Sequence, residues 1–344
     1  MKRNLFTLLL IAVSVQIFAW TSPVTIPDVG SARIHIVAQN AQNYLMDLTA
    51  SNSSCKTEAQ FVAKTDKMAN VFVALEADIV AICEVERNQE VLSYICNAMN
   101  EIYGQEVYTY VTDNLSASQS SSGYMPLKAG FIYNKEKVTP SGSTLSPYSY
   151  GEYNARMRIQ AFKENATNEL FVLSMNHFKA KSSGDDDGES IRIQNASNLI
   201  SKLNYVSSDD DILIMGDLNA YTEETPIQNL IKAGYEEQLV RFAPNAYTYN
   251  YYGEKGILDH AMANSTMADQ VTGAYAYHIN TSGYSSYKYS DHDAVLVGLR
   301  LGKSSGEGID DLQVLPAARK FIQNGQIFIE IDGQVYTILG NRVY

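Results

Sequence analysis

Apolar positions along this chain recur with two different periods, and the two kinds of segment follow one another through most of its length. Alternation with a period of two, or a short unbroken apolar run, predicts a strand, whereas spacings of three and four residues predict a helix. The predicted strands are residues 33–38, 77–82, 129–133, 159–162, 170–174, 212–215, 257–263 and 294–299, and the predicted helices are residues 58–75, 89–99, 189–203 and 225–233. Some strands follow helices and others follow hairpin-like turns. This mixture favours an α/β fold of two packed sheets with helices outside over a purely parallel, doubly wound sheet.

The N-terminal residues have the pattern of an export signal. Lys2 and Arg3 precede an apolar run over residues 5–18, and the small residue Ala19 follows it. This order is typical of a secretory signal peptide, and the run is short for a membrane span. We therefore predict a signal peptide over residues 1–20, with an N-terminal anchor helix as the alternative. We expect a bacterial protein that is secreted or held at the cell surface or in the periplasm, with no transmembrane segment after signal removal.

The composition changes near the C-terminus. Residues 302–311 are rich in glycine and serine, as a linker would be. Two apolar runs, 326–331 and 334–339, flank an Asp-Gly pair, which is a hairpin signature. Residues 312–344 are too few to build a core of their own. They resemble the short C-terminal sorting tails of secreted Bacteroidetes proteins, and a hairpin docked on the main domain is the alternative.

The charge of the chain limits the kinds of ligand that it can bind tightly. The 344 residues are 45% hydrophobic and 19% charged, which is typical of a soluble globular protein, and the net charge is −12. Tight, sequence-specific DNA binding requires many lysine and arginine contacts to phosphate, so an acidic chain disfavours it. A nuclease is still compatible, because a divalent cation can neutralise phosphate locally.

The three cysteines do not define a disulfide framework. Cys83 continues a predicted buried strand and is expected to be a packed thiol. A single bond between Cys55 and Cys96 is compatible with export, and the sequence leaves it open. No spacing of cysteine and histidine indicates structural zinc.

Six clusters of acids, amides and histidines lie at or beside the predicted strands. They are residues 39–43, 82–86, 175–179, 215–219, 257–260 and 289–293. Strand ends are where α/β folds gather polar side chains into one crevice. Oxygen-rich ligand sets suit Mg²⁺, Mn²⁺ or Ca²⁺. Each cluster alone has an ordinary structural explanation, and only their joint order is informative.

In this order the clusters resemble the endonuclease/exonuclease/phosphatase superfamily, the DNase I-like proteins, and are most similar to its bacterial extracellular nucleases. The resemblance covers residues 31–301. It implies a four-layered α/β sandwich and a metal-dependent phosphodiesterase that uses Mg²⁺, with Mn²⁺ or Ca²⁺ as alternatives. It also implies nucleic acid as the substrate and no stable protein partner. A phosphatase or phosphodiesterase acting on inositol phosphate or sphingomyelin is the alternative. A binding protein without activity is disfavoured, because the expected catalytic positions carry competent residues.

The resemblance also implies roles for individual residues. The metal site would be formed by Asn40, Glu84 and Asp291, the catalytic group by His177, Asp217, Asn219, Asp259 and His292, and additional phosphate contacts by Lys128 and Arg156. Asp217 would orient or deprotonate the attacking water, and Asp259 would hold His292. Residues 123–126 contain no acid, although relatives often place one there, so the partner of His177 is left open.

Two histidines directly follow an aspartate, and the strand pattern separates them. Asp259 and His260 are adjacent on a predicted strand, so their side chains point to opposite faces. If Asp259 faces the crevice, His260 faces away from it. His292 lies in a turn before the strand 294–299, and we therefore expect His292 to be the functional histidine.

Overall fold

The computed structural model describes residues 22–181, 186–206, 211–302, 319–323, 326–331, 334–337 and 343. The chain divides into two units after Gly302. The predicted signal peptide and residues 303–311 of the predicted linker lie outside the described residues. Within the described part of the chain, no helix combines the length and apolarity that a membrane span requires.

The first unit is built on two six-stranded sheets. The first sheet has the order β13 (Val271–Tyr277), β14 (Ala294–Leu299), β1 (Ile34–Tyr44), β2 (Ile79–Glu86), β4 (Leu127–Asn134) and β3 (Tyr108–Tyr110). The second has the order β5 (Val138–Leu145), β6 (Met157–Glu164), β7 (Leu170–His177), β8 (Ile212–Asp217), β12 (Asp259–Ala263) and β9 (Glu236–Glu237). A separate hairpin joins β10 (Tyr249–Tyr251) to β11 (Glu254–Gly256).

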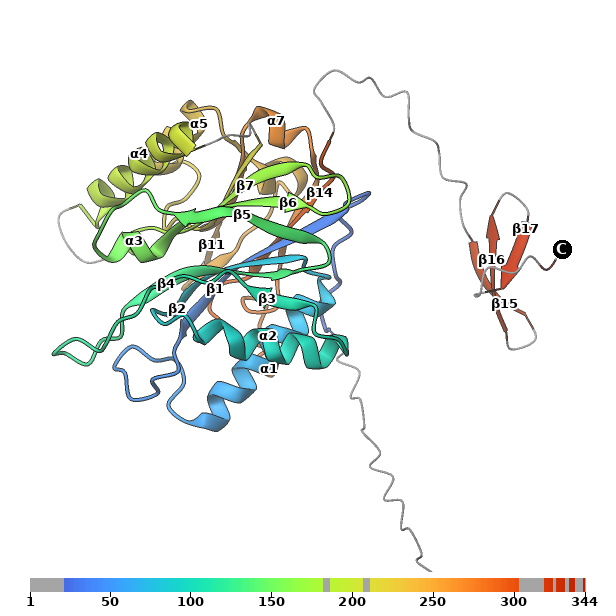
Figure 1. Cartoon of the computed structure of the whole chain (residues 1–344), viewed down its shortest axis with the longest axis horizontal. Helices are drawn as coiled ribbons and strands as arrows, with labels where there is room; N and C mark the ends of the chain where they lie inside the picture. The colour runs from blue at the N-terminus through green and yellow to red at the C-terminus, as the bar shows by residue number, and fades with distance from the viewer. Residues whose placement is uncertain are drawn as a thin grey trace, which may run out of the picture. The chain divides into compact units, whose positions relative to one another are not determined.

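Helices cover the outer faces of both sheets (Figure 1). Helices α1 (Glu58–Ala74) and α2 (Val91–Tyr103) share a hydrophobic cluster with the first sheet. Helices α4 (Glu189–Val206) and α5 (Thr225–Lys232) share another with the second sheet. The shorter helices are α3 (Glu152–Arg156), α6 (Gln238–Phe242) and α7 (Ser265–Ala268). The four-layered α/β sandwich predicted from the sequence is confirmed.

A third cluster fills the space between the sheets, and side-chain alternation explains how each strand serves two cores. On β6, Met157 and Ile159 pack under the helices, whereas Phe162 points toward the other sheet. The Phe162 ring lies 5.8 Å from that of Phe131 and 6.0 Å from that of Phe171, measured between centroids. Because successive side chains of a strand point to opposite faces, one apolar run supplies both interfaces.

The topology directs several strand ends to one edge of each sheet. Strands β1 and β2 are parallel neighbours in the first sheet, as are β7 and β8 in the second. Their carboxyl ends therefore lie together, and the antiparallel strands β14 and β12 begin at the same edges. The strands also extend further than the apolar pattern predicts, since β1 continues to Tyr44 and β2 to Glu86. Backbone pairing does not require apolar side chains, so the polar clusters lie within the last strand residues.

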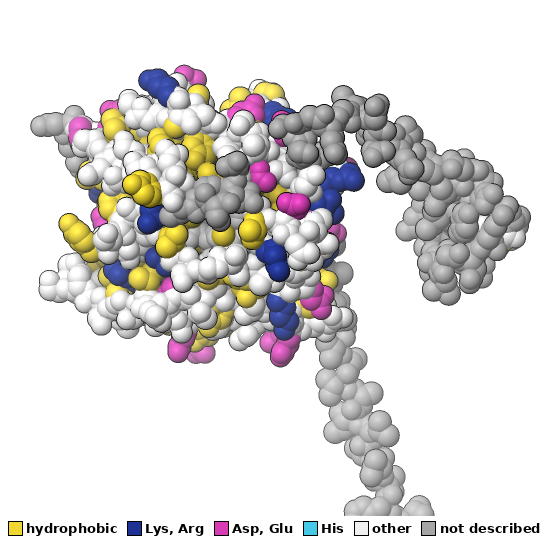
Figure 2. All heavy atoms as spheres, turned by 45° about the horizontal axis from the view of Figure 1, so that its top comes forward, with side chains coloured by type: hydrophobic (Ala, Val, Ile, Leu, Met, Phe, Trp, Pro, Cys, Tyr) yellow, Lys and Arg dark blue, Asp and Glu magenta, His cyan; other side chains and the backbone are white. Residues whose placement is uncertain are grey.

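The three cysteines are buried, and the visible surface carries mixed charge. Cys55, Cys83 and Cys96 are all buried free thiols, so the Cys55–Cys96 disulfide that the sequence left open is not formed. Burial raises the pKa of the Cys96 thiol to about 12. On the face shown in Figure 2, acidic and basic side chains are scattered among apolar and uncharged ones, without an extended basic surface.

The second unit is a small antiparallel sheet of β15 (Arg319–Gln323), β16 (Gln326–Ile331) and β17 (Gln334–Thr337). Strands β16 and β17 pair with Ile331 opposite Gln334, and the Asp-Gly pair of the predicted turn lies outside the described residues. Strand β15 pairs with β16 on the other side and was not predicted. Residues 338 and 339, which the sequence pattern adds to the last strand, lie outside the described residues.

Candidate active site

Side chains from both sheets meet at the shared edge. The Asn40 amide nitrogen donates to Glu84 Oε1 at 3.0 Å and to Asp217 Oδ2 at 2.9 Å. Asn40 is fully buried, and Asp217 is almost so. One amide therefore holds a carboxylate of each sheet in a fixed position. The Asn40 amide oxygen accepts from the backbone N–H of Gln42 at 2.9 Å, so it faces the backbone and not the carboxylates.

The backbone around these residues is held in an unusual conformation. Glu84 has a φ of 55°, and Gln42, Asn43 and Asn219 each have a φ of 49°. Residues other than glycine rarely adopt this left-handed backbone conformation, and strained residues of this kind are concentrated at active sites. Gly216 has a φ of 120°, and a Cβ there would lie 2.2 Å from the Asn176 carbonyl oxygen, so only glycine fits before Asp217.

His177 lies beside both carboxylates. Its Nε2 is 3.4 Å from Glu84 Oε1 and 3.9 Å from Asp217 Oδ2. Within the described part of the chain its Nδ1 has no hydrogen-bond partner. Burial, together with the nearby Arg156 guanidinium, lowers the pKa of His177 to about 3. The ring is therefore neutral at physiological pH.

His292 has the opposite electrostatic setting. Its Nδ1 is 2.7 Å from Asp259 Oδ2, and its Nε2 is 3.8 Å from Asp217 Oδ2. Burial alone would lower the pKa of His292, but the Asp259 and Asp217 carboxylates outweigh it and raise that pKa well above the ordinary value. The Tyr249 ring packs against the imidazole with centroids 4.6 Å apart. A cationic His292 and a neutral His177 thus flank one carboxylate.

The same cluster suits a divalent cation. Glu84, His177 and Asp217 bring one ligand atom each within 4.8 Å of the others, and so do Asp217, Asp259 and His292. Burial raises the pKa of Asp217 although the charge of His292 lowers it, so a further cation beside this carboxylate would stabilise its negative charge. Carboxylate oxygens in a buried, negatively charged setting are ligands that hard cations prefer. The donor set of Glu84, His177 and Asp217 therefore fits a divalent metal.

The other residues singled out from the sequence lie at varied places around this cluster. Asn219 donates its backbone N–H to Asp217 Oδ1 at 2.9 Å, while its side chain donates to the Phe178 carbonyl. Asp291 is half-buried and belongs to neither group of close ligand atoms. Its carboxylate acts electrostatically on His292.

The two bases expected to contact phosphate have protein partners in the structure. Lys128 is buried, and its Nζ lies 2.9 Å from Asp113 Oδ2. The Arg156 guanidinium donates to the Tyr124 hydroxyl at 3.0 Å. Tyr124 belongs to residues 123–126, the segment without an acid, and this segment thus contacts Arg156. Of the two bases, only Arg156 acts electrostatically on His177.

Two hydroxyl groups to which the sequence assigned no role support the site. The Thr248 hydroxyl accepts from the backbone N–H groups of Leu258 and Asp259, at 3.0 and 2.9 Å. The Ser290 hydroxyl donates to the Asn40 carbonyl at 2.6 Å and accepts from the His292 N–H. Ser290 directly precedes Asp291, so proximity in sequence was the available signal, whereas Thr248 lies eleven residues before Asp259 and only the fold brings its hydroxyl to the site.

His260 faces away from the site, as its strand position predicts. Its Nδ1 lies 2.6 Å from Glu237 Oε2 and its Nε2 lies 2.8 Å from the Ala220 carbonyl oxygen. The side chain is fully buried. Both ring nitrogens are therefore occupied by the protein, and His260 has a structural role.

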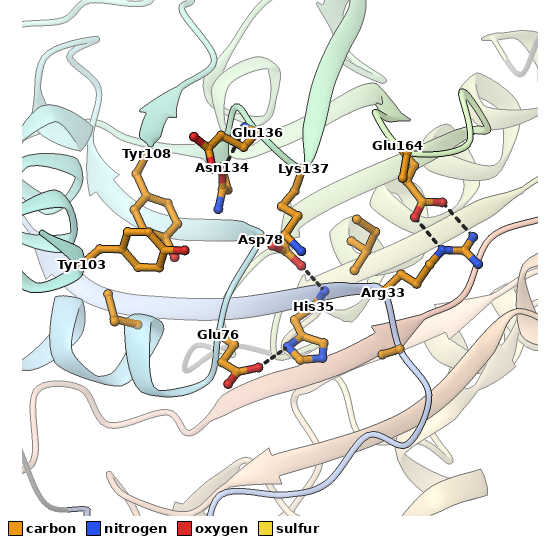
Figure 3. Close-up of a pocket in the computed structure, with 14 residues that line it drawn as sticks. Arg33, His35, Glu76, Asp78, Tyr103, Tyr108, Asn134, Glu136, Lys137 and Glu164 are labelled. Carbon is orange, nitrogen blue, oxygen red and sulfur yellow. Dashed lines mark hydrogen bonds and ion pairs between the residues drawn. The ribbon is translucent and has the colours of Figure 1, made fainter. Parts of the chain in front are cut away.

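A cavity of about 540 Å³ lies near the opposite end of the strands (Figure 3). His35, at the start of β1, and Asp78 lie in it, and the Asp78 carboxylate accepts the His35 backbone N–H at 2.9 Å. Arg33 pairs with Glu164 at 2.7 Å across the same space. These charged groups bind one another, so the cavity is less suited to catalysis than the cluster around Asp217.

Comparisons with known proteins agree with this geometry. The protein-family model described as "Endonuclease/Exonuclease/phosphatase family" matches residues 39–306 of the sequence. No curated protein matches the chain. Among solved structures, the endonuclease/exonuclease/phosphatase from Bacteroides vulgatus is 15% identical with a TM-score of 0.57, over 78% of this chain and 99% of that one.

Two further solved structures are similar to this chain. The mannosyl-6-phosphatase of Bacteroides thetaiotaomicron is 13% identical with a TM-score of 0.53, over 78% of this chain and 99% of that one. TDP2 from D. rerio, complexed with single strand DNA product, is 12% identical with a TM-score of 0.52, over 78% and 98%. At these identities the likeness establishes the fold.

Proposed function

This chain belongs to the endonuclease/exonuclease/phosphatase family of metal-dependent phosphoric ester hydrolases, and we propose that it is an exported phosphodiesterase that cleaves DNA or RNA. One observation carries the proposal. Glu84 and Asp217, from different sheets, are joined by one buried amide, with a neutral and a cationic histidine beside them. This arrangement combines a metal ligand, a base and a positive charge in one place.

The chemistry follows from the charge of the substrate. A phosphodiester is anionic and resists attack, so hydrolysis requires charge neutralisation and an aligned water. A divalent cation, for which we propose Mg²⁺ with Mn²⁺ or Ca²⁺ as substitutes, would be held by Glu84 and would neutralise phosphate charge. Asp217 has a raised pKa and can accept the proton of the attacking water.

The two histidines have separate tasks in this proposal. Asp259 occupies Nδ1 of His292, so the cationic ring has Nε2 to donate to a phosphate oxygen. His177 is neutral and can donate one hydrogen bond without adding charge. Positive charge is thereby concentrated on one side of Asp217, where charge develops in the transition state.

The hairpin beside the site supports a nucleic-acid substrate. Tyr249 and Tyr251 are two residues apart on β10, so their side chains share one face, and Tyr249 packs on His292. Tyr251 and the adjacent Tyr252 are 57% and 93% exposed. Their rings lie 4.7 Å apart, edge to face. An exposed aromatic stripe that leads away from a catalytic histidine suits stacking of nucleic-acid bases. The similar structure of TDP2 is complexed with single strand DNA product.

A second candidate is hydrolysis of a small or lipid phosphate, such as an inositol phosphate or sphingomyelin. The net charge of −12 favours it, because a polyanion is repelled by an acidic protein. The similar mannosyl-6-phosphatase is named for a sugar phosphate, which is also a small substrate. The same metal and histidines would serve either substrate.

One parallel assay separates the candidates. Purified protein with Mg²⁺ is tested against DNA, RNA, bis-p-nitrophenyl phosphate, sphingomyelin and mannose 6-phosphate. The proposal predicts cleavage of DNA or RNA and of the small diester, with none in EDTA. Hydrolysis confined to sphingomyelin or to the sugar phosphate would overturn the nuclease assignment.

Export is proposed from the N-terminal pattern alone. The basic, apolar and small residues of the first twenty positions support a cleaved signal peptide. N-terminal sequencing of the protein recovered from the medium or periplasm tests this directly. Recovery only from the cytoplasm with Met1 or Lys2 at its start would contradict export.

A further inference from the structure

A lysine of α1 is buried next to the site without a place in the chemistry above. Lys64 shares the inward face of the helix with Phe61 and Met68, and its side chain is buried. Burial lowers the pKa of Lys64 to about 8, so the side chain is still mainly cationic at neutral pH. A buried ammonium group is stable only when its donors are hydrogen-bonded. Its contacts therefore indicate what the residue does.

The Lys64 ammonium holds a turn of the backbone. Its Nζ donates to the Gln42 carbonyl oxygen at 3.0 Å and to the Ser54 hydroxyl at 2.9 Å. The Ser54 hydroxyl in turn donates to the Asn43 carbonyl oxygen at 3.1 Å. Gln42 and Asn43 are the two successive residues with a φ of 49°. Lys64 thus bonds both carbonyls of the left-handed turn, one directly and one through Ser54.

The amides of the same turn hold the predicted metal ligand. The Asn43 N–H donates to Glu84 Oε2 at 3.0 Å, and the Gln42 N–H donates to the Asn40 amide oxygen at 2.9 Å. Asn40 then donates to the other Glu84 oxygen at 3.0 Å. Both oxygens of the Glu84 carboxylate are therefore positioned by a turn whose carbonyls are linked to Lys64, that of Gln42 directly and that of Asn43 through Ser54, whose backbone N–H also donates to it.

We infer that Lys64 is a positioning residue that fixes the Gln42–Asn43 turn, and through it Glu84, for divalent cation binding; this rests on the metal site of the proposed function. Lys64 also has an electrostatic effect on cation binding, and its direction is opposite to that of the positioning effect. The Glu84 and Asp291 carboxylates act on its ammonium, so a buried positive charge lies near the cation site. Removing the charge alone would strengthen cation binding, whereas loosening the turn would weaken it. The direction of the change therefore separates the two roles.

The test compares Lys64→Met with Lys67→Met. Lys67 lies one turn further along the same helix, and its Nζ donates to the Lys288 carbonyl oxygen at 3.2 Å. Mn²⁺ binding is titrated by the electron paramagnetic resonance signal of the free ion, and melting curves are recorded without metal. Loss of ligand-orienting contacts typically weakens metal binding 10- to 100-fold, so we expect the Kd of Lys64→Met to rise about tenfold. Lys67→Met should bind as the wild type does.

Kinetics give a second readout. The Mn²⁺ concentration for half-maximal activity should rise with the Kd in Lys64→Met, while KM for bis-p-nitrophenyl phosphate at saturating Mn²⁺ stays unchanged. Ser54→Ala keeps the lysine charge and alters an exposed side chain, so it should fold even if Lys64→Met does not. It should weaken Mn²⁺ binding in the same direction.

Each result has a definite meaning. Unchanged or tighter Mn²⁺ binding in both Lys64→Met and Ser54→Ala overturns the positioning role. If Mn²⁺ still binds to Glu84→Gln, Glu84 is not the metal ligand, and the inference fails together with the proposed metal site. If the wild type binds Mn²⁺ through Glu84 but hydrolyses no diester, the proposed function fails, and the Lys64 inference is still decided by the binding data.

Discussion

Replacing His292 and His260 separately by alanine should have different consequences, although each follows an aspartate. His292 lies between Asp259 and Asp217 and carries a positive charge. Loss of a positioned acid–base or charge-stabilising histidine costs on the order of a hundredfold to ten-thousandfold in rate. This is about 3–5 kcal/mol of transition-state stabilisation. We expect His292→Ala to lower kcat on a diester substrate by that factor.

His260→Ala should instead lower stability. The imidazole pairs with Glu237 at 2.6 Å in a fully buried setting, and its other nitrogen bonds the Ala220 carbonyl. Removing one partner of a buried pair leaves a charge uncompensated and costs about 3–5 kcal/mol. At about 2 °C or more per kcal/mol, Tm should fall by about 6 °C or more. Below the melting range, kcat should stay near that of the wild type.

The assay measures kcat on bis-p-nitrophenyl phosphate with saturating Mg²⁺, well below the Tm of both variants, and melting curves by circular dichroism. His292→Gln accompanies His292→Ala, because glutamine keeps a polar side chain in the cavity without the charge. Equal losses of kcat in His292→Ala and His260→Ala with unchanged melting would refute the assignment. Such a result would make His260 a second catalytic group.

Three further predictions concern substrate, pH and the C-terminal unit. Tyr252→Ala should raise KM for a single-stranded oligonucleotide roughly tenfold and leave KM for bis-p-nitrophenyl phosphate unchanged. Tyr205→Ala is the control because that side chain is also 93% exposed, and equal effects of the two would exclude stacking at the hairpin. Burial lowers the pKa of His260, but Glu237 and the Ala220 carbonyl outweigh this effect, so the pKa lies above its ordinary value. The pair therefore stabilises the fold fully below about pH 6.5, and this contribution is lost as pH rises through the folded pKa. In urea unfolding, the stability difference between wild type and His260→Gln should be larger at about pH 6 than at about pH 9, and a constant difference would contradict the linkage. Deleting residues 312–344 should leave kcat unchanged, and failure of the truncated protein to fold would show that the tail is part of the main domain.

The apolar pattern predicted most of the strands that build the core, but it missed β13, which contributes Val271, Ala274 and Tyr277 to the core, along with short or edge strands. Strands β1, β2, β7 and β8 carry buried apolar runs, so periodicity finds them. Strand β5 consists largely of exposed polar residues at the edge of its sheet, and β10 and β11 are three residues each. Such strands form because a neighbour offers backbone hydrogen bonds, which the pattern of their own side chains does not report.

The site was predictable where strand ends carry the chemistry, and less so where tertiary contacts do. The order of the polar clusters pointed to Glu84, Asp217 and His292, and the structure brings these three together. The orientation of the Asn40 amide depends on the left-handed turn that follows it, which no spacing rule reveals. Lys64 reaches the site through a backbone carbonyl, and its only sequence signal is a lysine on the apolar face of a helix.

The role of Glu84 as the principal metal ligand is the central claim, and one measurement tests it most directly. Diester hydrolysis by wild type and Glu84→Gln is followed with Mg²⁺, after EDTA, and after Mg²⁺ is restored. Glutamine keeps the shape of the side chain but removes the charge that binds a hard cation. The account predicts that EDTA abolishes wild-type activity reversibly, and that Glu84→Gln is inactive at Mg²⁺ concentrations that saturate the wild type. Wild-type activity that survives exhaustive chelation, or Glu84→Gln activity equal to wild type, would contradict it.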